Sequence, residues 1–174
     1  MRSRFYPVCL ATWLVFMCCA TYALGYPLVL KRSEEVALPS NLLLSNETKR
    51  VLEKVWKRSP TFRLQCRRIA EATSLKVSLR FVAKKSNNFY ALTTAKRSAD
   101  GLVSISIEIF ILDCYIEMIG HEFEHVIEQI EGWNLKELAL DEGSGVIRNT
   151  DGSYETNRAV RAGRKVYAEY RVTR

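Results

Sequence analysis

Two histidines and the glutamate between them form the spacing in this sequence with the most specific chemistry. Positions 120–125 read GHEFEH, an H-E-x-x-H motif, and its His121 and His125 are the only histidines in the chain. Imidazole is the commonest side-chain ligand for metal ions, and four residues of helix bring two rings to the same face, one turn apart. The motif therefore predicts a metal site held by His121 and His125, with the carboxylate of Glu122 beside it.

The residues around the motif have the apolar spacing of an amphipathic helix. A helical projection of residues 114–131 gives one apolar face, expected to pack on the core: Ile116, Ile119, Gly120, Phe123, Val126, Ile127 and Ile130. A second face is acidic and is expected to be solvated: Glu117, Glu124, Glu128 and Glu131. His121, Glu122 and His125 lie on the remaining side, so the motif should point away from the main apolar face.

Helices are predicted on both sides of a region whose apolar period is two. Residues 45–48 (SNET) and 59–60 (SP) have the types that begin helices. The inner faces of these two helices are expected to comprise Val51, Leu52, Val55 and Trp56 in the first and Phe62, Cys66, Ile69 and Ala70 in the second. Alternation predicts strands over residues 75–81 and 102–110, with residues 89–95 pairing with the first of them.

The elements after the motif complete an order that resembles a known family. Residues 135–140 predict a short helical turn, residues 143–152 a loop or small hairpin, and a last helix is expected from Ser153 to about Tyr170. The motif and this order of elements resemble a minimal zincin metallopeptidase. The resemblance implies an α+β fold, in which a small antiparallel or mixed sheet packs on the H-E-x-x-H helix between N- and C-terminal helices. It implies Zn²⁺ as the cofactor, under the sheet.

The third metal ligand is not fixed by the motif. Catalytic zinc usually takes three protein ligands and leaves one position for water, and no third histidine is present. Glu131 stands where metzincins place a third histidine, but Glu128 replaces the glycine that would turn the chain there. Cys114 lies about two helical turns before His121. These positions argue against Glu131 and Cys114 as ligands.

Two glutamates remain as candidates for the third ligand. Glu142 lies in a predicted loop, whereas Glu155 is predicted to open the inward face of the last helix, together with Ala159, Ala162, Gly163, Val166 and Tyr170. A buried carboxylate needs a partner, and a metal ion is one, so Glu155 is preferred. The alternative is that Glu155 is a first-turn acid favoured by the helix dipole. As a ligand it would resemble the gluzincins, whose third ligand is a glutamate on a later helix.

The expected reaction is the hydrolysis of a peptide bond in a peptide or protein substrate. A metal-activated water would attack the carbonyl, with Glu122 as the general base. The resemblance places the substrate along the strand at residues 102–110, taken as an edge strand, although that strand could equally be structural. Candidate donors to the transition-state oxyanion are Tyr154, Tyr167, Tyr170 and Arg161.

Two other functions fit the same residues. One is a secreted zinc-binding or scaffold protein without turnover, and the other is a metal-dependent amidase that acts on cell-wall peptide cross-links. A wider similarity, from residues 59–62 (SPTF) to residues 154–156 (YET), relates the chain to secreted bacterial proteins that carry an H-E-x-x-H motif and have no assigned activity.

The first 25 residues have the pattern of a secretory signal peptide. Arg2 and Arg4 precede an apolar run over residues 5–24 that contains no acid, and residues 23–25 (ALG) offer small side chains for cleavage. The expected location is therefore the periplasm or the cell exterior. An uncleaved membrane anchor is the alternative, because the run is nearly long enough to cross a bilayer.

Export would have consequences for the rest of the chain. Residues 26–45 are expected to form an extended lead-in to a single domain over residues 46–174. Cys66 and Cys114 would lie in an oxidising compartment, where they form either a disulfide or two buried free thiols.

Charge is distributed unevenly between two regions. Residues 48–100 hold 14 Lys and Arg against 3 acids, whereas residues 108–142 hold 10 acids against Lys136 alone. We expect these regions to attract each other. Without Arg2 and Arg4 the net charge of +7 falls to +5. No nucleic-acid-binding motif or aromatic interleaving accompanies the basic region, so a nucleic-acid partner is not expected.

Overall fold

A four-stranded mixed sheet forms the centre of the protein in the computed structural model, which describes residues 38–83, 90–99, 103–110 and 114–172. Its strands lie in the order β1 (Leu42–Leu44), β2 (Leu75–Val82), β4 (Val103–Phe110) and β3 (Ala91–Arg97). A separate hairpin pairs β5 (Val146–Arg148) with β6 (Tyr154–Thr156). With five helices, this architecture confirms the expected α+β class.

The described residues belong to one compact unit, which spans Val36–Arg174. The predicted signal peptide, and residues 26–37 of the lead-in, lie outside the described residues. The end of the lead-in contains the short strand β1. Within the part of the chain that the structure describes, no helix combines the length and apolar character needed to cross a membrane.

Strand pairing differs from the prediction in a way that matters for the site. β2 pairs in parallel with β1 and with β4, and β3 pairs antiparallel with β4. The predicted pairing of residues 89–95 with the strand at 75–81 is therefore wrong. β4 has a neighbour on each side, so the prediction that residues 102–110 form an edge strand is wrong as well; β1 and β3 are the edge strands of the described sheet. The buried Ile105, Ile107 and Ile109 suit a central strand.

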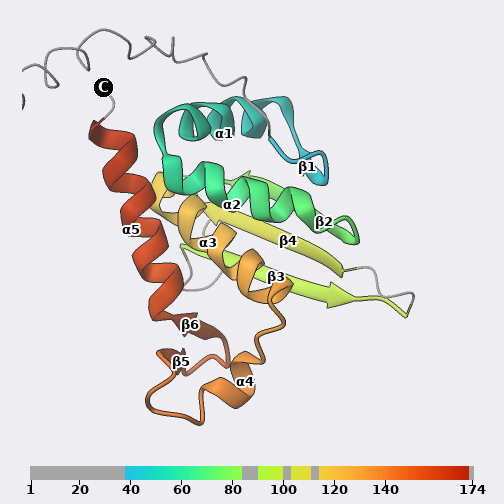
Figure 1. The fold of residues 1–174 in the computed structure, drawn as a ribbon, viewed down its shortest axis with the longest axis vertical. Coiled ribbons are helices and arrows are strands. Elements are labelled where there is room, and N and C mark those ends of the chain that lie inside the picture. The colour runs from blue at the N-terminus through green and yellow to red at the C-terminus, as the bar shows by residue number, and fades with distance from the viewer. Residues whose placement is uncertain (1–37, 84–89, 100–102, 111–113, 173–174) are drawn as a thin grey trace, which may run out of the picture. The chain divides into compact units, whose positions relative to one another are not determined.

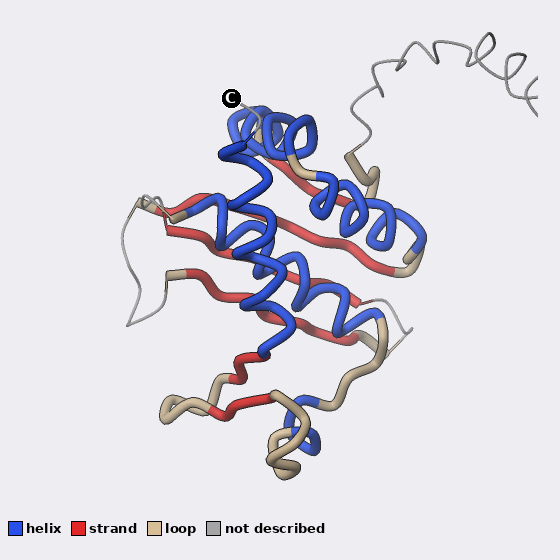
Figure 2. The backbone as a smooth tube through the Cα atoms, turned by 60° about the vertical axis from the view of Figure 1, so that its left-hand side comes forward, coloured by secondary structure: helices blue, strands red, loops and turns tan. Residues whose placement is uncertain are grey.

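Four long or medium helices cover one face of this sheet (Figures 1 and 2). They are α1 (Asn46–Arg58), α2 (Pro60–Glu71), α3 (Tyr115–Ile130) and α5 (Asn157–Val172), while α4 (Leu135–Leu138) is a single turn. Ser45 and Ser59 cap α1 and α2 as predicted, because their hydroxyls accept hydrogen bonds from the backbone N–H of Thr48 and Phe62 at 3.2 and 3.0 Å.

The core lies between the sheet and these helices. Its fully buried members come from every layer: Leu52, Val55, Phe62, Ile69, Val77, Ile107, Ile119, Phe123, Val126 and Val166. The prediction that Ala70 belongs to the inner face of α2 is wrong, because Ala70 is exposed. Gln65 is buried on this helix although it was not predicted to be. Gln65 is tolerated there because its amide nitrogen donates to Gly120 O at 2.9 Å.

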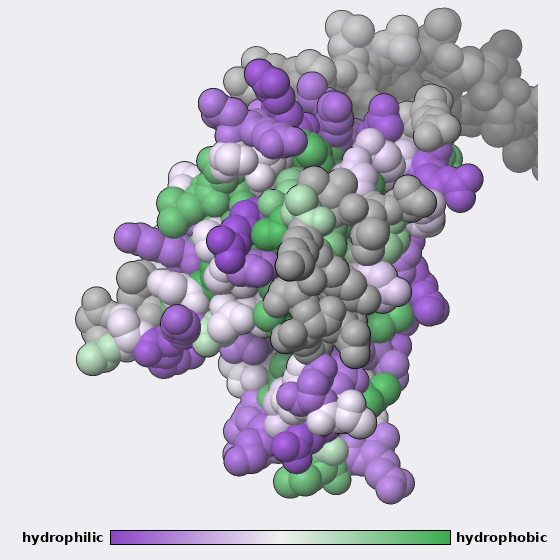
Figure 3. Space-filling view, turned by 180° about the vertical axis from the view of Figure 1, so that it is seen from behind, coloured by the Kyte–Doolittle hydropathy of each residue, from purple (hydrophilic) through white to green (hydrophobic). Residues whose placement is uncertain are grey.

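The opposite face of the sheet carries polar side chains. Lys76, Arg80 and Ser104 are exposed there, and Arg80 pairs with Glu108 of the neighbouring strand. Figure 3 views the molecule from behind relative to Figure 1 and shows hydrophilic and near-neutral residues interspersed with a few hydrophobic ones. Together with the pair between Arg68 and Glu131 at 3.2 Å, the Arg80–Glu108 pair joins the basic and acidic regions of the sequence.

Two glycines let α3 and α5 approach each other closely. A Cβ on Gly163 of α5 would lie 2.7 Å from Glu117 O and 3.1 Å from the Cβ of His121 on α3. A Cβ on Gly120 would lie 2.6 Å from a methyl carbon of Val166. These separations are shorter than van der Waals contact, so the pair of helices depends on both positions having no side chain.

We expect Gly163→Ala to destabilise the fold. The added methyl meets the backbone oxygen of Glu117, which cannot rotate away, and overpacking of this kind costs about 1–3 kcal/mol. The gain in helix propensity, about 1 kcal/mol, offsets only part of that cost. Urea unfolding followed by circular dichroism measures the change, with the exposed Arg164→Ala on the same helix as the control. A Gly163→Ala protein that is as stable as the wild type would contradict the close packing described above.

Candidate metal centre

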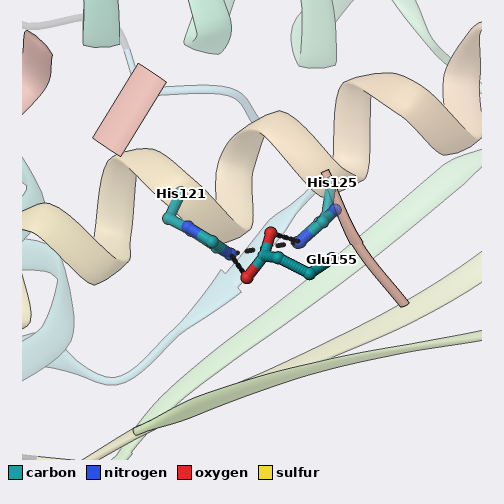
Figure 4. Close-up of side chains that lie close together, drawn as sticks. All are labelled: His121, His125 and Glu155. Atoms are coloured by element: carbon teal, nitrogen blue, oxygen red, sulfur yellow. Dashed lines mark hydrogen bonds and ion pairs between the residues drawn. The ribbon is translucent and has the colours of Figure 1, made fainter. Parts of the chain in front are cut away.

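The two histidines of the motif lie on α3, and both rings turn toward the carboxylate of Glu155 (Figure 4). They line the same cavity as residues 91–95 of β3. Their Nε2 atoms are 3.2 Å apart, and the ring planes meet at 74°. His121 is 8% exposed and Glu122 is 4% exposed. The predicted core face of α3 is confirmed, because its apolar residues from Ile116 to Ile127 are buried.

Glu155 completes a group of three with the histidines. Its two carboxylate oxygens lie 3.3 Å from His121 Nε2 and 3.6 Å from His125 Nε2. The residue belongs to β6 rather than to the last helix, which begins at Asn157. The prediction that Glu155 opens this helix is therefore wrong, and so is its alternative as a first-turn acid. Thr156 is the residue that caps the helix, through a 2.9 Å bond from Ala159 N.

The spacing of these three side chains matches what a small cation requires. Zinc lies about 2.0–2.2 Å from nitrogen and oxygen ligands in a tetrahedral site, so two ligand atoms are about 3.3 Å apart. The two Nε2 atoms, 3.2 Å apart, are close to that value, and each ring has a different oxygen of Glu155 beside it, at 3.3 Å for His121 and 3.6 Å for His125. His121, His125 and Glu155 thus offer three ligand atoms that could hold a metal ion.

A fully buried carboxylate joins the two segments that carry these ligands. Glu128 Oε2 lies 2.7 Å from His125 Nδ1, and Glu128 Oε1 accepts a hydrogen bond from the hydroxyl of Thr156 at 2.6 Å. Thr156 directly follows Glu155. An imidazole that bonds a carboxylate through Nδ1 presents Nε2 in a fixed direction, as metal-bound histidines commonly do.

The acidic face of α3 is thus only partly solvated, contrary to the prediction. Glu128 is 0% exposed and Glu124 is 8% exposed. Glu124 accepts hydrogen bonds from Gln65 Nε2 at 2.7 Å and from Arg158 Nε at 2.6 Å. The helical projection assigned Glu124 and Glu128 to solvent because it could not show that α5 packs against this face and supplies Thr156 and Arg158. The spacing His125-x-x-Glu128 was the available signal, since residues three apart on a helix are neighbours.

Glu122 is held from the sheet side. The hydroxyl of Thr93 on β3 donates to Glu122 Oε2 at 2.5 Å. Burial raises the pKa of Glu122, while the charges of His121 and His125 and the hydrogen bond from Thr93 act in the opposite direction. A carboxyl whose pKa is raised toward neutrality can both accept and return a proton.

The charges of the cluster are strongly coupled. Burial alone would lower the pKa of His125, but hydrogen bonds to Glu128 and Glu155 outweigh it and raise the pKa to about 10. Burial alone would raise the pKa of Glu155, yet hydrogen bonds from His121 and His125 lower it to about 2. Without a cation, a proton on His125 therefore takes the place that the positive charge of a metal ion would fill.

A cavity of about 380 Å³ opens over the cluster. It runs between β3 and the β5–β6 hairpin, and its lining includes Thr93, Glu122, Asn149, Ser153 and Tyr154. Of the four candidate oxyanion donors, only Tyr154 lines it. Tyr167 and Tyr170 instead pack against the core, under Arg171 and Arg58 respectively, and Arg161 is exposed on α5. These three side chains therefore lie outside the lining of the cavity.

The other sequence candidates lie away from the cavity lining. Glu142 is an exposed turn residue, and Glu131 binds Arg68 and Arg158. Cys66 is buried in the core on α2, whereas Cys114 stands half-buried at the start of α3. Both are free thiols, which agrees with the alternative to a disulfide, although only Cys66 is fully buried.

Comparison with known proteins finds no family model, no curated protein and no solved structure that matches this chain. The chemistry of the site therefore has to be argued from its own geometry.

We expect Glu128→Gln to weaken zinc binding by about 10- to 100-fold, the usual effect of altering a carboxylate behind a ligating histidine. The amide keeps the shape of the side chain but removes its negative charge from His125. Competition with a chromophoric chelator measures the affinity. Glu137→Gln, at an exposed position of α4, is the control and should bind zinc like the wild type. Equal affinities for the two variants would show that Glu128 does not support His125.

Zinc binding at pH 7 should release a proton from His125. The pKa of about 10 means that the ring is protonated at pH 7, and a ligating imidazole must be neutral. Because protons compete with zinc for His125, the affinity for zinc should rise with pH up to about 10 and fall as the pH drops. Titration calorimetry in buffers of different ionisation enthalpy counts the protons. Zinc binding with no proton release would contradict this charge assignment.

Proposed function

We propose that this protein is a zinc-dependent peptidase in which Glu122 is the general base. The observation that supports it is the group of His121, His125 and Glu155, whose ligand atoms all lie within 4.8 Å of one another, directly beside a buried carboxylate in an open cavity. Two histidines and one glutamate are a ligand set that suits zinc and leaves one coordination position free.

The residues of the chain divide the chemistry between them. A zinc ion held by His121, His125 and Glu155 would polarise a peptide carbonyl and lower the pKa of a bound water. Glu122 accepts a proton from the attacking water and passes it to the nitrogen of the leaving amine. Tyr154 lines the same cavity, and its hydroxyl is the candidate donor to the oxyanion.

The substrate would bind as an extended chain along β3 rather than along β4. β3 is one of the two edge strands of the described sheet and, unlike β1, it lines the cavity. A peptide added to an edge strand is held by backbone hydrogen bonds, whatever its side chains are. The charged Lys96 and Arg97 near the end of β3 also limit unwanted pairing with other sheets.

Two features favour turnover over mere zinc storage. A structural zinc site is usually closed by four protein ligands, whereas this group has three and faces a cavity. A pure binding site also has no use for a buried carboxylate at position 122. The leader-like pattern of residues 1–25 keeps the expectation of export, and an amidase acting on cell-wall peptide cross-links would use the same chemistry.

Three variants test the proposal. Glu122→Gln should bind zinc normally but lose about 100- to 10,000-fold in kcat on a denatured protein substrate, as expected for the loss of a general base. Glu155→Ala should lose zinc and activity together, whereas Glu142→Ala, in an exposed turn, should retain both. Metal analysis and a fluorogenic protease assay give the two readouts.

The outcomes separate the chemistry from the ligand assignment. Zinc-loaded wild type that hydrolyses no peptide or cross-link, or does so at the rate of Glu122→Gln, would defeat the hydrolase proposal. Zinc loss in Glu142→Ala but not in Glu155→Ala would instead overturn the choice of third ligand.

A further inference from the structure

We propose that Thr93 is a positioning residue that couples the general base to the strand on which the substrate binds. The inference rests on the proposed function and deepens it. Thr93 carries no charge and is not one of the candidate metal ligands, yet its side chain contacts Glu122 while its backbone N–H and C=O point to the edge of the sheet.

The side chain of Thr93 orients the carboxylate of Glu122. Its hydroxyl donates to Glu122 Oε2 at 2.5 Å, a length typical of a hydroxyl bonded to a charged carboxylate. Branching at Cβ restricts the rotamers of threonine, so the direction of this bond is set by the backbone of β3. Without it, the carboxylate would be drawn toward the imidazoles of His121 and His125 on its own helix.

The backbone of Thr93 points to the free edge. Phe110 N donates to Tyr90 O at 3.0 Å, which makes Tyr90 and Phe110 a hydrogen-bonded pair of the antiparallel ladder. Such pairs alternate with non-bonded ones, so Thr93 opposite Ile107 is a non-bonded pair. Its N–H and C=O therefore point away from β4, as do those of Ala91 and Ala95.

The hydrogen bond to Glu122 and the outward-pointing backbone groups of Thr93 together align a bound peptide with the general base. A peptide that adds to β3 would bond to the backbone of Thr93 while the hydroxyl of the same residue holds Glu122. The peptide bond next to that pairing position is then the one within reach of the base. Small residues on either side, Ala91 and Ala95, share the face of β3 that looks toward α3 and leave room for substrate side chains.

The test compares Thr93→Val, which keeps the shape and removes the hydroxyl, with Thr93→Ser, which keeps the hydroxyl. Thr93→Val should lower kcat by about 10- to 100-fold, the effect of a misplaced reacting group, with KM and zinc affinity unchanged. Thr93→Ser should recover most of the loss. Ser106→Ala, which removes a hydroxyl from the opposite face of the same sheet, is the matched control and should behave like the wild type.

A second measurement is independent of activity. Thermal unfolding of Thr93→Val, Glu122→Leu and the double variant should give non-additive shifts in Tm. The Thr93 hydroxyl can stabilise the fold through this bond only while the Glu122 carboxylate is present to accept it. Additive shifts, an unchanged kcat in Thr93→Val, a change in KM alone, or no recovery in Thr93→Ser would each overturn the proposal. If zinc-loaded wild type shows no hydrolysis, the proposed function fails, while the Tm cycle still decides whether Thr93 holds Glu122.

Discussion

The buried carboxylate of Glu128 is the group on which the geometry of the candidate metal centre depends. One oxygen contacts His125 Nδ1 and the other accepts from Thr156, so a single side chain connects the motif helix to the segment that carries Glu155. A buried carboxylate with only one of these partners would be costly. Each bond therefore stabilises the other, and the ligands are held at about the right separation by the fold itself.

The packing of α5 on α3 makes this connection reachable. Gly120 and Gly163 bring the helices close enough for the Thr156 hydroxyl to reach Glu128 at the start of α5. Arg158, two residues further along, binds Glu124 and Glu131 at the C-terminal half of α3 and its cap, and it stacks over Trp133 at 5.1 Å. The two close-packed glycines and the salt bridges of Arg158 thus fix where α5 lies along α3 and how it is rotated. This packing sets the position of Glu155 over the histidine rings.

The sequence predicted local features better than the partners that distant segments supply. Capping by Ser45 and Ser59, the motif helix, the strands and the α+β class follow from patterns within a few residues, and the structure confirms them. The strand with which β3 pairs could not be predicted in the same way. Alternation of apolar residues indicates which face of a strand is buried, but not which strand is its neighbour. Glu124 and Glu128 were misplaced for a related reason, since their partners Arg158 and Thr156 are about thirty residues away.

Glu155 lies beside the histidines, but not for the reason that the sequence suggested. Glu155 was placed near the histidines as part of a helix, whereas it lies in β6, where side chains alternate between two faces. In that strand the next residue, Thr156, points opposite to Glu155. Thr156 reaches back to Glu128, which leaves Glu155 turned toward His121 and His125. The short hairpin, rather than a helix dipole, therefore sets the direction of the third carboxylate, and shifting its register by one residue would turn that carboxylate away from the rings.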